Sequence, residues 1–161
     1  KKALRFMKIN DYYFGNRFCT KFDKYPLTEI TQEIEKHIKV FSPNIIFTHC
    51  NKDLNIDHGI VHKAVMNASR PKYKSKLKYI YSFEIVCSSN WIFENKFNPN
   101  TYVDISKFLK KKQKAFQVYT NEKRPFPFPR SKKGIETLAR LRGLQAGLKA
   151  AEAFKLERAI V

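Results

Sequence analysis

The alternation of apolar and polar positions is clearest between residues 26 and 71. Over residues 26–41 the apolar side chains recur every three or four positions, which predicts an amphipathic helix. A short apolar run at 44–48, with two isoleucines, predicts a buried strand. From His58 the apolar positions return to helical spacing, and Pro71 ends that helix. This order of helix, strand and helix indicates an α/β fold with a parallel sheet.

The flanking segments are consistent with further elements of such a fold. Residues 4–9 and the aromatic, β-branched run 79–86 predict strands. A helix is expected after Asp104 or Ser106, extending to about residue 119. From Ser131, which we expect to cap a helix, the pattern is helical to the end of the chain. We therefore predict a single α/β domain over residues 1–161.

Composition fits a globular protein that works in a reducing compartment. The 161 residues are 43% hydrophobic, enough for one domain with a real core. No apolar run is long enough to span a membrane, and no signal-peptide pattern is present. The three cysteines are widely spaced and odd in number, which favours free thiols and a cytoplasmic location.

The charge of the chain is strongly positive. Lys and Arg total 32 against 14 Asp and Glu, a formal net charge of +18. Most of the cations are Lys, and runs such as 110–112 lack interleaved stacking aromatics. We therefore interpret most of them as a solvated surface, which makes nucleic acid an unlikely partner. A polyanion-binding function and an anionic sugar substrate remain as alternatives.

Candidate chemistry lies in the polar loop that joins the 44–48 strand to the next helix. Asp57 directly precedes His58, and a neutral imidazole beside a carboxylate is a good zinc ligand. Alternatively, Asp57 only caps the helix. His62 lies one turn after His58, but Gly59 replaces the Glu of the H-E-x-x-H pattern, so we interpret His62 as a structural or rim residue.

The stretch carrying these residues reads TH-x-x-x-DLN-x-DH, and its helix ends A-x-RP. It resembles the LmbE-like (PIG-L) N-acetylglucosaminyl deacetylases, zinc hydrolases that remove acetyl from N-acetylated sugars. The resemblance implies a three-layer, Rossmann-like, mostly parallel sheet flanked by helices. It also implies that His58 is one of three ligands to Zn2+ or another divalent metal, with Asp57 and Asn55 in catalytic roles.

The resemblance continues along the chain and suggests residues that contact an N-acetylated sugar. The expected substrate-binding residues are Asn16, Arg17, His49, Trp91 and Arg130. Asn16 and Arg17 could also form an ordinary turn, and Trp91 could equally be a core residue. Two positions depart from the family pattern: Asn55 stands at a His of many members, and Phe128 replaces the His of P-H-P-R-S.

The family's remaining metal ligands and its general base come from an N-terminal H-P-D-D motif, which these residues lack. We expect the sequence to be the central and C-terminal part of a longer deacetylase domain whose first strand is missing. A relative that has lost its metal site and only binds carbohydrate or polyanions is the alternative. The protein could also form a homo-oligomer.

Overall fold

The chain divides into two units, which are described separately. The structure is a computed structural model that describes residues 1–71, 75–94 and 96–161. Unit 1 comprises Lys1–Asn16 and Tyr102–Ala153, and unit 2 comprises Arg17–Thr101 and Phe154–Val161. That the two units together form the single domain predicted above stays a prediction.

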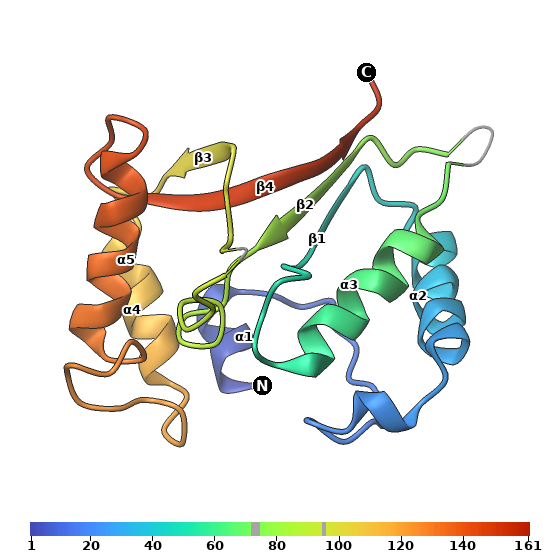
Figure 1. The fold of residues 1–161 in the computed structure, drawn as a ribbon, viewed down its shortest axis with the longest axis horizontal. Helices are drawn as coiled ribbons and strands as arrows, with labels where there is room; N and C mark the ends of the chain where they lie inside the picture. The colour runs from blue at the N-terminus through green and yellow to red at the C-terminus, as the bar shows by residue number, and fades with distance from the viewer. Residues whose placement is uncertain (72–74, 95) are drawn as a thin grey trace. The chain divides into compact units, whose positions relative to one another are not determined.

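Unit 2 contains the segment with the clearest sequence pattern. Helix α2 (Leu27–Phe41) is followed by strand β1 (Ile45–His49), helix α3 (Ile56–Ala68) and strand β2 (Tyr79–Phe83). A short 3-10 turn, η1 (Phe22–Lys24), precedes α2. Helices α2 and α3 pack side by side in Figure 1. The predicted helix, strand and helix are confirmed. Most of their ends agree with the prediction to within two residues.

The sheet has the order β1-β2-β4-β3. β1 and β2 are parallel, with Ile45 opposite Tyr79 and His49 opposite Phe83. The parallel step inferred from the sequence is therefore confirmed. Because parallel strands end at the same edge, the loop after β1 and the loop after β2 begin next to each other.

The last strand corrects one expectation. Residues 131–161 were expected to be helical throughout, but α5 (Lys132–Leu144) ends early and β4 (Ala151–Ala159) runs antiparallel to β2. Gly147 at φ 69° lies in the turn between them. The residues of β4 have only a weak intrinsic preference for helix. Pairing with β2 forms the backbone hydrogen bonds that these residues would otherwise make within a helix.

Unit 1 contains α1 (Lys2–Met7), most of β3 (Thr101–Asp104), α4 (Leu109–Gln117) and α5. Its buried cluster comprises Ile105, Leu109, Ala139 and Ala150. The strand expected at 4–9 is wrong, because α1 forms there and ends at Lys8 in a left-handed conformation (φ 59°). A six-residue run is too short for periodicity to separate helix from strand.

The helix boundaries of unit 1 are confirmed in one case and corrected in the other. The Ser131 hydroxyl accepts the Gly134 backbone N–H at 2.9 Å, so Ser131 caps α5 as predicted. Helix α4 starts later than expected, because the Asp104 carboxylate accepts the Ser106 N–H in a turn before it. Among the described residues, no helix is both long and apolar enough to cross a bilayer.

Candidate functional site

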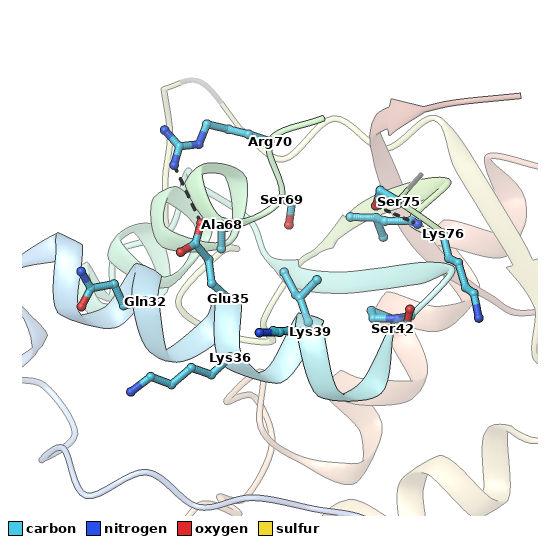
Figure 2. A pocket seen from close by; sticks show the side chains of 13 residues that line it. Gln32, Glu35, Lys36, Lys39, Ser42, Ala68, Ser69, Arg70, Ser75 and Lys76 are labelled. Carbon is cyan, nitrogen blue, oxygen red and sulfur yellow. Dashed lines mark hydrogen bonds and ion pairs between the residues drawn. The ribbon is translucent and has the colours of Figure 1, made fainter. Parts of the chain in front are cut away.

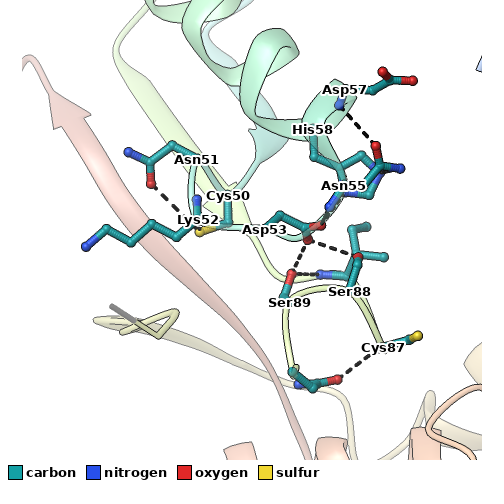
Figure 3. A network of polar contacts seen from close by, with 12 residues as sticks. Cys50, Asn51, Lys52, Asp53, Asn55, Asp57, His58, Cys87, Ser88 and Ser89 are labelled. Atoms are coloured by element: carbon teal, nitrogen blue, oxygen red, sulfur yellow. Dashed lines mark hydrogen bonds and ion pairs between the residues drawn. The ribbon is translucent and has the colours of Figure 1, made fainter. Parts of the chain in front are cut away.

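A buried carboxylate, Asp53, lies at the centre of the loop that follows β1. Its side chain is 1% exposed. One oxygen accepts the Asn55 backbone N–H at 2.8 Å, and the other accepts the hydroxyls of Ser88 and Ser89 from the segment after β2 (Figure 3). These donors satisfy both oxygens of the carboxylate in a site with little solvent. The parallel pairing of β1 with β2 brings the two loops together.

His58, in the first turn of α3, lies between Asp53 and Asn55. Its Nδ1 is 3.0 Å from Asp53 Oδ1, an ion-pair distance without the alignment of a hydrogen bond. Its Nε2 is 3.3 Å from the Asn55 side-chain nitrogen. The carboxylate favours a proton on Nδ1, so the lone pair of a neutral ring lies on Nε2.

His49, the last residue of β1, stacks on His58. The two ring centroids are 4.3 Å apart and the planes differ by 10°. Burial, and next the neighbouring His58, lower the pKa of His49 to about 4, although Asp53 acts in the opposite direction. His49 is therefore neutral at pH 7, and the stack holds no more than one imidazolium.

His62 has the structural role expected for it. It is buried, and its Nδ1 lies 2.9 Å from the backbone carbonyl of His49. This contact ties α3 to the end of β1 and so fixes the distance between the His49 and His58 rings.

Asp57 makes different contacts from those expected. Asn55, not Asp57, caps α3, because the Asn55 side-chain oxygen accepts the Asp57 N–H at 3.0 Å. The buried Asp57 carboxylate accepts the backbone N–H groups of Thr20 and Phe22, and in Figure 3 it points away from Asp53. The carboxylate against His58 is therefore Asp53. Asp53 belongs to the D-L-N signature of the sequence, but the prediction named Asp57 because Asp57 is adjacent to His58.

The expected substrate-contact residues are divided between the two units. Arg17 pairs with Glu33 of α2 and lies 5.3 Å from the Tyr25 ring centroid. Trp91 is 42% exposed, which excludes the core role. Asn16 and Arg130 belong to unit 1, where Arg130 pairs with Glu122. Of the predicted site residues, the structure brings together His49, Asn55 and His58.

The described residues do not by themselves fit the expected zinc site. A catalytic zinc needs three protein ligands and an open position. Over residues 1–71, 75–94 and 96–161, no group of three or more His, Cys, Asp or Glu side chains is arranged to hold a metal. His58 Nε2 offers one ligand atom, with Asp53 behind the ring as metal-bound histidines require.

Comparison with known families identifies the segment that carries this site. Residues 1–69 match the PIG-L family, described as GlcNAc-PI de-N-acetylase. The match covers 69 of the 161 residues. The match includes β1, the Asp53–Asn55 loop and α3, and it confirms the resemblance drawn from the sequence.

Solved structures share the fold over nearly the whole chain. The conserved protein TT1542 from Thermus thermophilus is 18% identical with a TM-score of 0.70, covering 99% of this chain and 71% of that one. The N,N'-diacetylchitobiose deacetylase from Pyrococcus horikoshii is 16% identical with a TM-score of 0.76, covering 98% and 61%. GalB, the 4-carboxy-2-hydroxymuconate hydratase from Pseudomonas putida KT2440, is 18% identical with a TM-score of 0.63, covering 99% and 70%. The α/β fold class is thereby confirmed, and this chain spans less than two thirds of the chitobiose deacetylase.

Proposed function

We propose that this protein is a deacetylase-type hydrolase that removes the acetyl group from an N-acetylated sugar or sugar conjugate. Water adds to the amide carbonyl carbon, the C–N bond breaks, and acetate and the free amine are released. The PIG-L match of residues 1–69 and the deacetylase among the structural neighbours support this reaction class.

The arrangement of Asp53, His58 and Asn55 carries the proposal. The Asp53 carboxylate, 3.0 Å from His58 Nδ1, favours the proton of a neutral ring on that nitrogen and leaves Nε2 with its lone pair. The capping bond from Asp57 N–H fixes the Asn55 side-chain oxygen, so the Asn55 amide N–H group is directed toward His58 Nε2. An amide donor at that position is placed to bind the oxyanion that forms from an attacked carbonyl.

A divalent metal, zinc or another, belongs to the proposal with His58 Nε2 as one of its ligands. Zinc would supply Lewis-acid activation of the carbonyl and of water. The described residues give it no complete ligand set. The Asn55 side chain would have to leave Nε2 when a metal binds there.

Metal content and acetate release test the proposal together. We expect the full-length protein to retain about one divalent metal ion per chain by mass spectrometry of the metal. It should also release acetate from N-acetylglucosamine conjugates. His58→Ala should lose both. His37→Ala, which changes a histidine on α2 instead, is the matched control and should lose neither.

A carbohydrate-binding relative without catalysis is the second candidate. Asn55 and Phe128 stand where many family members carry His, and GalB shows that the same fold supports a different reaction in another protein. A full-length protein that binds sugar, contains no metal and releases no acetate would establish this candidate and overturn the hydrolase.

A further inference from the structure

An open pocket of about 550 Å3 in unit 1 is lined by an unusual set of side chains. It lies where the end of α4, the loop at 121–130 and the start of α5 meet. Half of the residues lining it are cationic, and none of them is Asp or Glu. We call it the basic pocket. The residues that line it include Gln117, Lys123, Arg124, Phe126, Lys132 and Lys133.

Other basic pockets of this chain contain their own counter-ions. In the pocket drawn in Figure 2, between α2 and α3, Arg70 lies 3.8 Å from the Glu35 carboxylate. In the pocket along α4 and α5, Arg140 pairs with Glu136 at 2.8 Å. The absence of a lining carboxylate therefore distinguishes the basic pocket from these two, and is not a simple result of a lysine-rich composition.

The acidic residue nearest to the pocket in sequence is already engaged. The Glu122 carboxylate forms an ion pair with Arg130, which belongs to the same loop. The loop is closed by a backbone bond from Arg124 N–H to the Arg130 carbonyl at 3.2 Å. Arg124 Nη1 also donates to the Asn121 and Lys123 carbonyls, at 2.7 and 2.9 Å. These bonds order the loop that carries Lys123 and Arg124, and like charges held near one another favour the binding of an external anion.

One wall of the pocket is aromatic. Phe126 is 57% exposed, and the Lys133 ammonium lies 4.4 Å from its ring centroid. The Ser131 hydroxyl already accepts the Gly134 N–H, so the start of α5 is capped internally and the cationic side chains carry the argument. A planar apolar surface beside clustered cations suits a ligand that has both a ring and several negative charges.

We propose that the basic pocket binds a nucleoside di- or triphosphate. Two or three successive phosphates match four cations better than one phosphate would, because Arg binds phosphate through its planar fork and Lys as a point charge. The nucleobase packs on Phe126. The volume lies in the range of about 300–1,000 Å3 found for small-molecule sites. This proposal does not rest on the proposed hydrolase activity.

Calorimetric titration of the full-length protein with ATP and with inorganic pyrophosphate tests the assignment. We expect both to bind at about 0.15 M salt. Lys123→Gln with Lys133→Gln should weaken both about tenfold or more, which is about 1.4 kcal/mol. Lys2→Gln with Lys111→Gln removes the same charge from unit 1 outside the pocket and is the matched control. Phe126→Ala should weaken ATP several-fold more than pyrophosphate.

Three results would overturn the proposal. One is an equal loss of affinity in the control pair, which would indicate non-specific attraction to a positively charged protein. Another is a wild type that binds neither probe. The third is a single-stranded oligonucleotide that displaces ATP and depends on the same two lysines, which would make the pocket part of a nucleic-acid surface.

Discussion

Asp53 and Asp57 are four residues apart, and their side chains contact different parts of the chain. Asp53 accepts two serine hydroxyls from the loop after β2 and faces His58. Asp57 instead accepts backbone N–H groups from the segment before α2. The direction of each carboxylate is set by which backbone and hydroxyl donors surround it, so the residue adjacent to His58 in sequence is not the one that contacts its ring.

Replacing Asp53 by Asn should separate the role of this carboxylate from that of the fold. Asp53→Asn removes the charge that favours the Nδ1 proton of His58, so for the proposed hydrolase we expect acetate release to fall about 10–100-fold. The 15N shifts of the His58 ring should show a change of tautomer. Asp11→Asn, an exposed position in unit 1, is the control. Full activity in Asp53→Asn, with His58→Ala inactive, would contradict the role given to Asp53.

The three cysteines should differ in reactivity. Cys19 is exposed, whereas Cys50 and Cys87 are buried. Burial raises the pKa of the Cys50 thiol, with a smaller opposing effect from the Lys52 N–H that reaches its sulfur at 3.3 Å. A raised pKa means less thiolate at about pH 8. We expect iodoacetamide to label Cys19 first and all three only after unfolding, as read by mass spectrometry of peptides. Equal labelling of Cys19 and Cys50 in the folded protein would contradict this.

Helix α5 illustrates how an element is shaped by its surroundings. The turn after it folds back, and the Leu148 N–H bonds to the Gly143 carbonyl at 2.8 Å. A Cβ at Gly143 would lie 2.5 Å from the Leu148 oxygen and 2.8 Å from the Ala150 Cα. Gly143 is therefore required by a close backbone approach that allows the chain to enter β4.

Two glycine substitutions should have opposite effects on stability. Gly143→Ala forces backbone atoms apart, so we expect a loss of about 1–3 kcal/mol in the free energy of unfolding. Gly59→Ala, inside α3, places its Cβ at 3.5 Å from the nearest atom, Asn51 O, which is ordinary contact. It should gain up to about 1 kcal/mol from helix propensity. Urea unfolding followed by circular dichroism measures both, and a neutral Gly143→Ala would mean that the turn relaxes without cost.

Charge is a property of the whole molecule. A net charge of +18 produces repulsion throughout the folded chain, and surface ion pairs such as Arg140–Glu136 offset little of it. The free energy of folding should therefore depend on ionic strength more than that of a neutral protein of this size.

Added salt should stabilise the protein. Raising NaCl from about 0.05 to about 0.5 M shortens the screening length below the spacing of most surface charges. We expect a gain of about 1 kcal/mol, which corresponds to a rise of about 2–4 °C in Tm for a chain of this length. Differential scanning calorimetry at constant pH measures it. A fall in Tm would show that ion pairs outweigh repulsion.

Elements whose signals are local could be predicted from the sequence alone. The periodicity of 26–41, the apolar run before His49 and the helix after Asn55 each depend on neighbours within a few positions, and α2, β1 and α3 formed there. The D-L-N-x-D-H signature likewise located the segment that matches the PIG-L family and carries His58. Short-range hydrogen bonds and side-chain spacing are sufficient to specify such elements.

Features that join distant parts of the chain depend on the folded structure and could not be predicted from the sequence. β4 is a strand because β2, about seventy residues earlier, pairs with it. Asp53 is the partner of His58 because the serines after β2 hold it in place, and the cations of the basic pocket meet because a loop returns to the start of α5. In each case the deciding contact is between residues far apart in the sequence, whose proximity depends on the fold and has no local signal.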